Sequence, residues 1–256
     1  MGCDCGGTGW IVVVGGVKDC ECRILKVHEY RLKKSGLPDR YLAASFDNFK
    51  SAGADRSVEY AAMLSRSYVE KFPTLEEGNG LLYTGTVGTG KTHLAIAVIR
   101  ELRLRYSADT LFVDFRDLLK RMQATFSNKT LAGAQSETDI LRPVLEAQVL
   151  VLDELGAARA TDWTFDVVEH VINSRYNARG ATIVTTNLPN HPAGYTAPRD
   201  ASRGYAAAAM AAAVSPETLG DRIGARMFSR LQQMCTVIEV KGEDYRGRKQ
   251  NGNVGS

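Results

Sequence analysis

The segment GTVGTGKT at residues 85–92 constrains the fold of this chain more than any other feature. It matches the P-loop pattern, in which glycines let backbone amides curl around phosphate groups. An apolar stretch at residues 80–85 precedes it and a helix-forming stretch at residues 92–106 follows it, as the pattern requires. The segment predicts an ATP site in which Lys91 reaches the outer phosphates and the Thr92 hydroxyl binds Mg²⁺. The predicted contacts are Gly85, Thr86, Val87, Gly88, Thr89, Gly90, Lys91 and Thr92.

Strand and helix patterns alternate along most of the chain. Because parallel strands need crossover connections, this alternation predicts an α/β fold with a largely parallel sheet and helices on both faces. The alternation breaks at residues 190–215, which are rich in proline, glycine and alanine and are expected to form an inserted loop with one helix. The expected helices are 57–72, 92–106, 116–126 and 164–179, and the expected strands are 80–85, 110–115, 148–155, 181–187 and 236–240.

Two further strands are expected to end on polar residues beside the P-loop. In VLVLDEL, Asp153 is predicted to hold the magnesium through water, and Glu154 to polarise the water that attacks the γ-phosphate. In IVTTN, the strand ends on Thr185, Thr186 and Asn187. A polar side chain there is expected to orient the attacking water, and the alternative is an asparagine that caps a turn.

Three arginines recur at a spacing of four in LGDRIGARMFSRLQQM, namely Arg222, Arg226 and Arg230. We expect one helix over residues 219–234 that carries them along a single face. A surface helix with solvated arginines would give the same pattern. A row of arginines behind a nucleotide fold is also typical of an arginine finger, which reaches the γ-phosphate bound by a neighbouring subunit.

Five blocks, in this order, resemble the AAA+ ATPases of the DnaC/DnaI helicase-loader and IstB transposition-helper group: YLAASFDNF, GTVGTGKTHLAIAV, VLVLDELGA, TDWTFDVVEHVINSRYNARGATIVTTNLP and SRLQQMCTVIEVKGEDYR. The resemblance implies an AAA+ P-loop ATPase domain over residues 41–246, assembly into a homo-oligomeric ring or spiral, and no helical lid domain after EDYR. It also implies that Asn187 is the first sensor and that Arg230 is the finger, with Arg226 beside it. A second alignment with the family, in which Arg222 takes the finger position, stays open.

One departure from the family is the insert at 190–215, because family members pass from the sensor strand to the arginine helix in a short step. Residues 247–256 are polar and are expected to form a disordered tail.

Two CxC pairs, separated by fourteen residues, lie near the N-terminus: Cys3, Cys5, Cys20 and Cys22. Thiols in a cytosolic ATPase stay reduced, so clustered cysteines favour a metal over disulfides, and Zn²⁺ held by four thiolates is the predicted occupant. Reduced thiols without metal, or His28 as an alternative ligand, stay open. Residues 1–40 are expected to form an arm and linker that are too short to bury a hydrophobic core. A bound metal would let the arm fold. The fifth cysteine, Cys235, lies in an apolar run and is expected to be buried.

The net charge of +3 is too small to indicate a nucleic-acid-binding protein without a local basic cluster. The stretch 116–129 carries Arg116, Lys120 and Arg121, and residues 100–105 carry three more arginines. Solvated helix faces are the default explanation. In a ring of subunits, one such helix, with 116–129 preferred, is expected to line a central channel and track single-stranded DNA.

The leading hypothesis is an ATPase that loads a replicative DnaB-type helicase onto single-stranded DNA, and the resemblance implies that the arm docks the helicase. The alternative within the same family is a transposition helper that organises duplex target DNA. A small-molecule P-loop kinase would need an acceptor-binding segment that the sequence does not offer, and Glu154 with Asn187 argues against a scaffold that binds ATP without turnover. The chain carries no long apolar run and no secretory signal, so a cytoplasmic protein without a membrane segment is expected.

Overall fold

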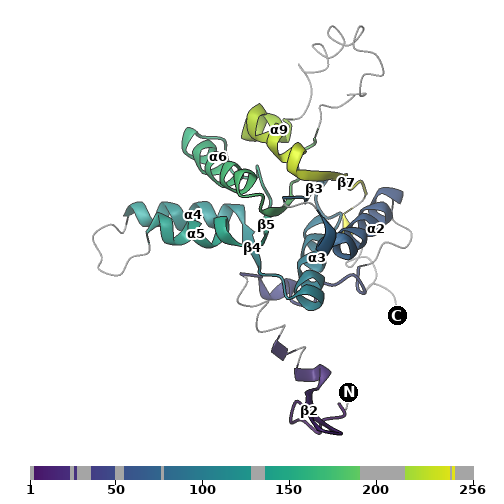
Figure 1. Cartoon of the computed structure of the whole chain (residues 1–256). Helices are drawn as coiled ribbons and strands as arrows, with labels where there is room; N and C mark the ends of the chain where they lie inside the picture. The colour runs from purple at the N-terminus through teal and green to yellow at the C-terminus, as the bar shows by residue number, and fades with distance from the viewer. Residues whose placement is uncertain are drawn as a thin grey trace, which may run out of the picture.

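A five-stranded parallel sheet forms the centre of the molecule (Figure 1), and its strand order is β4-β5-β6-β3-β7. The structure, a computed structural model, describes residues 3–23, 26–27, 36–49, 55–75, 78–127, 136–190, 217–242 and 244–245 of the 256. The predicted α/β fold with a parallel sheet is confirmed. The strands are β3 (Gly80–Thr84), β4 (Thr110–Asp114), β5 (Val149–Asp153), β6 (Ala181–Thr185) and β7 (Cys235–Glu239).

Helices cover both faces of the sheet because the central strands are apolar on both sides. Leu81 and Tyr83 of β3 pack in one core with α2 and α3, whereas Leu82 packs in a second core on the opposite face. In Figure 1, α2 and α3 lie to the right of the sheet, with α4, α5, α6 and α9 on the other side. The helices are α2 (Arg56–Lys71), α3 (Lys91–Tyr106), α4 (Phe115–Ser127), α5 (Glu137–Glu146), α6 (Asp162–Asn177), α8 (Leu219–Ile223) and α9 (Ala225–Met234).

The strand order decides where the site forms. Strand β6 pairs with β3 on one side and with β5 on the other. All three strands are parallel, so their carboxyl ends share one edge of the sheet. The P-loop after β3, the acidic pair after β5 and the polar residues after β6 therefore meet there, which is where open α/β sheets bind ligands.

The prediction of one arginine-bearing helix over residues 219–234 is wrong. Gly224 interrupts it with φ 85° and ψ 142°, a conformation that glycine adopts without a steric penalty, and two short helices result. A capping box between Thr218 and Asp221 starts α8, and α9 starts directly after Gly224. Arg222 therefore does not share a helical face with the other two arginines.

Helix α5 was not expected from the sequence, although its start carries a clear signal. Ser136 and Asp139 form a capping box, which is a helix-start signal. The proline at position 143 argues against a helix in the sequence, because proline inside a helix is unfavourable. The fully buried Arg175 of α6 donates to the carbonyl oxygens of Val144, Leu145 and Ala147, at 3.2, 3.2 and 2.9 Å. These bonds satisfy carbonyl groups that the last turn of a helix leaves unpaired.

The N-terminal part contains an antiparallel hairpin of β1 (Trp10–Val13) and β2 (Gly16–Asp19). Short 3₁₀ helices occur at Asp39–Tyr41 and Phe72–Thr74. Leu37, Ala44 and Phe46 belong to the core on the α2 and α3 face. The expected insert at 190–215 lies outside the described residues except for its first position, and so does the tail at 247–256. None of the helices in the described part of the chain is long and apolar enough to cross a membrane.

Candidate nucleotide site

The P-loop is a close-packed turn between β3 and α3. Gly88 (φ 81°) and Gly90 (φ 95°) adopt left-handed conformations that favour glycine. A Cβ on Gly90 would lie 2.7 Å from Cε2 of Phe49, and a Cβ on Gly88 would lie 2.8 Å from Cα of Asp244. Glycine is therefore required at both positions for conformation and for space.

Lys91 opens helix α3 with its side chain folded against the loop. The residue is 5% exposed, and its Nζ donates to the carbonyl oxygens of Gly85 at 2.8 Å and Thr86 at 2.5 Å. The N-terminus of a helix favours anions because its first amides are unpaired and its dipole is positive there. An ammonium group and a helix N-terminus thus occur together at the predicted phosphate position.

Two hydroxyl groups converge on the buried carboxylate of Asp153. Thr92 Oγ1 donates to Asp153 Oδ1 at 2.9 Å, which joins the P-loop to the end of β5. Thr185 Oγ1, at the end of β6, donates to the same oxygen at 2.6 Å. The predicted meeting of Thr92 and Asp153 is therefore present in the folded chain.

Burial raises the pKa of Asp153, and the nearby negative charges of Glu154 and Asp114 act in the same direction, whereas the bonds from Thr185 and Thr92 lower it. A divalent cation would offset this burial of negative charge. Hydroxyl and carboxylate oxygens are the ligands that Mg²⁺ prefers. The donor set formed by Thr92 and Asp153 therefore fits magnesium.

Glu154 directly follows β5 in an unusual backbone conformation. Its φ is 57°, the left-handed region that residues other than glycine rarely adopt. Its amide donates to Thr185 Oγ1 at 3.0 Å, and the amide of Leu155 donates to the carbonyl oxygen of Thr185 at 2.9 Å. The side chain is half-buried, and its role as the residue that polarises water stays a prediction.

The three polar residues at the end of β6 divide into two groups. Thr185 and Thr186 are buried, and Thr186 Oγ1 donates to the carbonyl oxygen of Leu155 at 2.8 Å. Both threonines are therefore occupied within the protein. Asn187 is exposed and follows them directly, so of the three it alone offers an exposed side chain, as a sensor residue must.

The three arginines have different surroundings. Arg222 is held by the Glu217 carboxylate through Nε at 2.8 Å and through a second bond from Nη2, and its Nη1 donates to the carbonyl oxygen of Ala158 at 2.7 Å. These contacts hold Arg222 against its own chain, which argues against Arg222 as the finger.

Arg226 and Arg230 both lie on α9 and contact α6. Arg226 pairs with Glu169 at 3.3 Å while its side chain stays 70% exposed, and the Arg230 guanidinium lies 5.1 Å from the ring centre of Tyr176. None of these contacts involves the P-loop of the same chain. The finger role of either arginine stays a prediction.

The hairpin brings the four N-terminal cysteines together: the Sγ atoms of Cys3, Cys5, Cys20 and Cys22 all lie within 4.8 Å of one another. A tetrahedral zinc site with bonds near 2.3 Å needs sulfur atoms about 3.8 Å apart. Two of the Sγ–Sγ distances are shorter than this, 3.0 Å for Cys3–Cys5 and 3.3 Å for Cys5–Cys22. Hydrogen bonds with Cys3 and Cys22 lower the pKa of the Cys5 thiol to about 6. The cluster thus has the ligand type of a zinc site, and its sulfur atoms would move slightly apart around a metal. His28, the alternative ligand, lies outside the described residues.

The basic residues of α4 are exposed, unlike part of those of α3. Arg116, Lys120 and Arg121 all face solvent. On α3, Arg103 is buried and donates to the carbonyl oxygen of Thr110 at 2.9 Å, and Arg100 donates to that of Leu42 at 2.8 Å. On α4, Arg116 Nη2 donates to the carbonyl oxygen of Ala157 at 3.0 Å, and Lys120 Nζ lies 3.4 Å from Asp117 Oδ1. Of the two basic helices, α4 thus offers the more exposed cationic surface, and residues 128–129 lie outside the described part.

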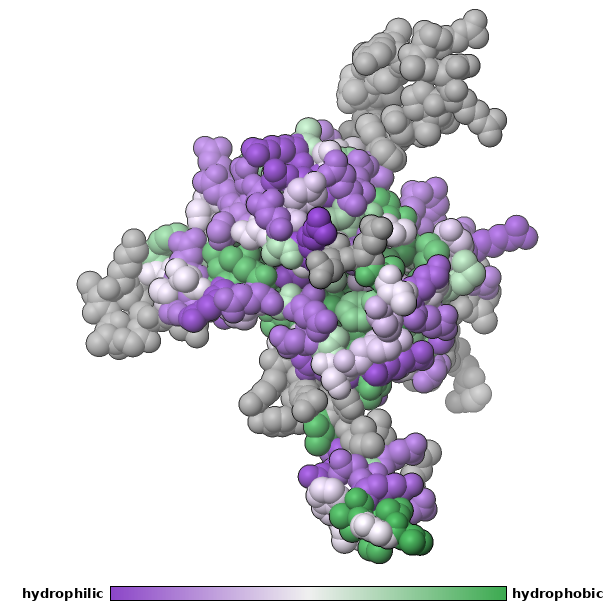
Figure 2. Space-filling view, viewed as in Figure 1, coloured by the Kyte–Doolittle hydropathy of each residue, from purple (hydrophilic) through white to green (hydrophobic). Residues whose placement is uncertain are grey.

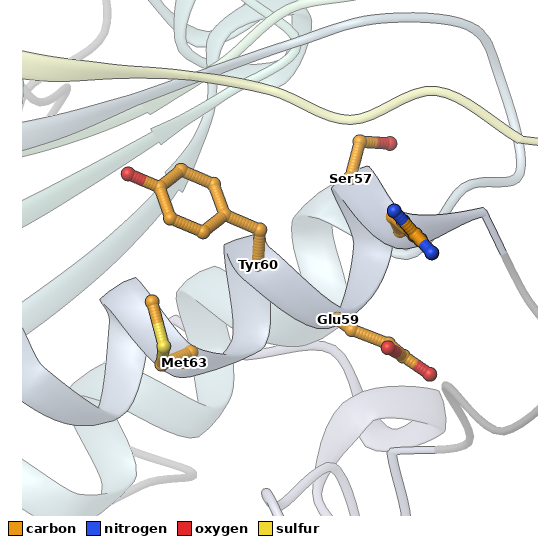
Figure 3. A pocket seen from close by; sticks show the side chains of 5 residues that line it. Ser57, Glu59, Tyr60 and Met63 are labelled. Carbon is orange, nitrogen blue, oxygen red and sulfur yellow. The ribbon is translucent and has the colours of Figure 1, made fainter.

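A surface pocket of about 670 Å³ lies along α2 and is separate from the P-loop residues (Figure 3). Its lining is Arg56, Ser57, Glu59, Tyr60 and Met63. Ser57 connects this helix to the segment after β7, because its Oγ exchanges hydrogen bonds with the backbone of Lys241 at 3.0 and 2.8 Å. The pocket is lined by one helix and contains no cluster of catalytic groups.

Residues around the P-loop that the sequence did not single out come from two distant segments. Tyr245 N donates to the carbonyl oxygen of Gly88 at 3.1 Å, which places Asp244 against the loop. Phe49 packs on His93 with ring centres 5.3 Å apart, and His93 Nε2 lies 2.8 Å from the carbonyl oxygen of Ser45. The two segments fall in the SFDNF and KGEDYR blocks, so the resemblance was the signal that pointed to them.

Comparison with family models gives a match to the IstB-like ATP binding protein family over residues 19–197. Among curated proteins, the chain is 28% identical over 169 residues to the replicative helicase loader DnaC of Escherichia coli (strain K12), covering 65% of this chain and 64% of that protein. It is 26% identical over 178 residues to the uncharacterized protein YqaM of Bacillus subtilis (strain 168), covering 67% of this chain and 54% of that protein. The chain thus spans between half and two thirds of the length of these relatives.

Solved structures agree with the fold. A crystal structure of the DnaC helicase loader matches 80% of this chain and 100% of its own, with a TM-score of 0.60 and 28% identity. A DnaI structure matches 81% of this chain and 93% of its own, with a TM-score of 0.54 and 22% identity. The replication initiator DnaA, solved with AMPPCP and single-stranded DNA, matches 86% of this chain and 57% of its own, with a TM-score of 0.56 and 17% identity. The last two likenesses concern the fold alone.

Proposed function

Because the chain belongs to the IstB-like ATP binding protein family and has the fold of an AAA+ P-loop ATPase, we propose that it hydrolyses ATP to load a replicative ring helicase onto single-stranded DNA. The observation that carries the hydrolytic part is the bond between Thr92 and Asp153. It supports one site in which the Thr92 hydroxyl and the Asp153 carboxylate would bind magnesium, and Lys91 and Glu154 are their neighbours in sequence. The likeness to DnaC loaders supports the choice of a helicase as the partner.

In this proposal, Lys91 and the amides that open α3 bind the phosphates, and Thr92 with Asp153 holds Mg²⁺. Magnesium, when bound, neutralises phosphate charge. Glu154 holds the attacking water and accepts its proton, and Asn187 orients that water. Arg230, with Arg226 beside it, acts on the nucleotide of a neighbouring subunit in a homo-oligomer.

The N-terminal arm is the proposed docking segment for the helicase. The four cysteines bind Zn²⁺, which fixes a hairpin that is too small to fold on its own core. Figure 2 shows apolar surface gathered on the hairpin, where Val12 is 83% exposed and Trp10, Val13, Val14 and Val17 are exposed as well. Apolar surface that a protein leaves in solvent is typical of an interaction site.

The exposed basic residues of α4, Arg116, Lys120 and Arg121, are the proposed contacts for the backbone of a single DNA strand. Positive side chains that track phosphates give binding that depends on salt and tolerates sequence differences. In a ring or spiral, copies of α4 would repeat this contact along the strand.

A transposition helper that organises duplex target DNA is the second candidate function. The match to the IstB-like family supports it. The two candidates share the ATP site and differ in partner and DNA. A helper needs duplex DNA and a transposase, whereas a loader needs single-stranded DNA and a helicase.

The test uses the full chain, the replicative ring helicase of the organism that encodes it, and circular single-stranded DNA, which a closed ring cannot thread. The measured quantity is the amount of helicase bound to the circle with ATP and without nucleotide, and the Lys91→Ala variant is the matched control. We expect helicase on the circle only with the wild-type chain and ATP. If the amount of helicase on the circle does not depend on the chain, and the chain binds duplex DNA in an ATP-dependent way, the loader function is refuted and the transposition-helper function is favoured.

A further inference from the structure

We infer that Thr185 is the positioning residue of this site, because its one hydroxyl sets both the Asp153 carboxylate and the turn that places Glu154. The expected effect of Thr185 on kcat rests on the proposed ATP hydrolysis. Its expected effect on Mg²⁺-dependent nucleotide binding does not depend on hydrolysis. The family resemblance implies a sensor role for Asn187, two residues after the end of β6. The structure places Thr185 in a different task, inside the protein.

The hydrogen bonds of Thr185 have only one possible direction. Its Oγ1 lies 2.6 Å from Asp153 Oδ1 and 3.0 Å from the amide nitrogen of Glu154. An ionised carboxylate only accepts and a backbone amide only donates, so the hydroxyl must give its proton to Asp153 and accept from Glu154. The residue is 1% exposed, so water does not replace either partner easily. A bond to an ionised acceptor is stronger than a neutral one.

The same hydroxyl stabilises the strained start of the turn after β5. Glu154 has a left-handed φ of 57°, and the amide of this same residue donates to Thr185 Oγ1. The turn is also tied to β6 by the Leu155 amide, which donates to the Thr185 carbonyl oxygen at 2.9 Å, and by Thr186 Oγ1, which donates to the Leu155 carbonyl oxygen at 2.8 Å. Strained backbone persists where its surroundings hold it, and at this site the holding groups come from β6.

The two threonines bonded to Asp153 are not equivalent. Thr92 is the residue that the P-loop pattern assigns to magnesium. In the described part of the chain, the Thr185 hydroxyl bonds to the Asp153 carboxylate and to the Glu154 amide. The Thr185 bond therefore orients Asp153 independently of whether a ligand engages Thr92. Because both hydroxyls donate to Oδ1, the Thr185 bond still holds that oxygen when Thr92 turns to a ligand.

The test compares Thr185→Val, which removes the hydroxyl and keeps the shape, with Thr185→Ser, which keeps the hydroxyl. Thr110→Val is the matched control. Thr110 of β4 is 2% exposed, and in the described part of the chain its hydroxyl has no hydrogen-bond partner, so its loss should change nothing at the site. Nucleotide affinity is titrated with EDTA and across a Mg²⁺ series, and kcat and KM are measured for ATP hydrolysis.

For Thr185→Val, we expect nucleotide affinity in EDTA equal to wild type, a higher Mg²⁺ concentration for half-maximal tightening, and a kcat lower by about 10- to 100-fold. Thr185→Ser should restore both quantities toward wild type, and Thr110→Val should match wild type throughout. A purely structural role would lower thermal stability and leave the Mg²⁺ dependence unchanged, and that result would overturn the inference.

If Thr185→Val does not fold, the decision passes to Thr185→Ser and Thr185→Cys. Serine should keep the Mg²⁺ dependence, whereas cysteine, a weak hydrogen-bonding group, should shift it. Equal Mg²⁺ dependence for serine and cysteine would also overturn the inference. A wild-type chain that binds nucleotide in a Mg²⁺-dependent way but does not hydrolyse it would refute the proposed function and leave the Thr185 comparison valid.

Discussion

The Thr92 hydroxyl donates to Oδ1 of Asp153 across 2.9 Å, although the two residues lie 61 positions apart in the chain. This bond joins the P-loop directly to the end of β5. Preorganised polar groups act on a reacting phosphate without a reorganisation step at the moment of reaction. Most of the site chemistry proposed above depends on this contact.

Asp153→Asn should stabilise the folded chain and weaken its use of magnesium. The folded pKa of Asp153 is raised by burial, so its ionised form at neutral pH opposes folding, and this penalty disappears as the pH falls through the folded pKa. Asparagine keeps an oxygen that accepts from both threonines without the charge. We expect a melting temperature higher by about 2 to 4 °C, as about 1 kcal/mol gives for a chain of this size, and little Mg²⁺-dependent tightening of nucleotide binding. A lower melting temperature without ligand would contradict this.

Asp244→Asn should increase nucleotide affinity. Asp244 lies against Gly88 of the P-loop, so its negative charge lies near the predicted position of the phosphates. Removing one like charge is expected to tighten ATP binding by about 5-fold at low salt, and the gain should shrink as salt screens the charge. The control is Glu239→Gln, an exposed residue of β7 that pairs with Lys241 at 3.0 Å. Unchanged ATP affinity at low salt would show that Asp244 does not oppose the phosphates.

The arm should carry about one zinc ion per chain at neutral pH, and chelation should unfold the arm without melting the ATPase domain. Cys5→Ser should lose the metal. Cys235→Ala should keep it, because Cys235 is buried in the sheet domain, where burial raises its thiol pKa to about 12. Metal analysis of freshly purified, reduced protein checks the stoichiometry, and a protein without zinc would refute the site.

Arg230→Ala should bind ATP normally and hydrolyse it at least about 100-fold more slowly, because a finger acts on the nucleotide of a neighbour. Mixing this variant with Lys91→Ala should restore part of the activity, since one chain supplies an intact P-loop and the other an intact Arg230. The rescue should grow with protein concentration and with single-stranded DNA.

Normal hydrolysis by Arg230→Ala, with no rescue in mixtures at concentrations where wild type assembles, would place the finger elsewhere. Arg226 would be tested next, because its side chain is 70% exposed. Arg222 is the weaker candidate because Glu217 and Ala158 of the same chain hold it.

The P-loop and the acidic pair were predictable from sequence because each is a short segment whose chemistry depends on neighbours in the chain. The role of Thr185 was not, because its partners lie at the end of another strand, Asp153 as its last residue and Glu154 directly after it, and only the strand order brings them together. The four-residue spacing of the arginines was misleading for a local reason. Gly224 fits a helix in sequence but adopts a φ of 85° in the fold, which turns Arg222 away from the helix of Arg226 and Arg230.

The central claim is that Lys91 and Glu154 belong to one ATPase site with separate tasks, and the most direct test is to measure nucleotide affinity and single-turnover hydrolysis on the same preparations of wild type, Lys91→Ala and Glu154→Gln. Lys91→Ala should lose nucleotide binding, because it removes a phosphate contact. Glu154→Gln should bind ATP like wild type while hydrolysis falls by orders of magnitude, because Glu154 acts on the attacking water and not on the bound phosphates. Equal nucleotide affinity in wild type and Lys91→Ala would contradict the account.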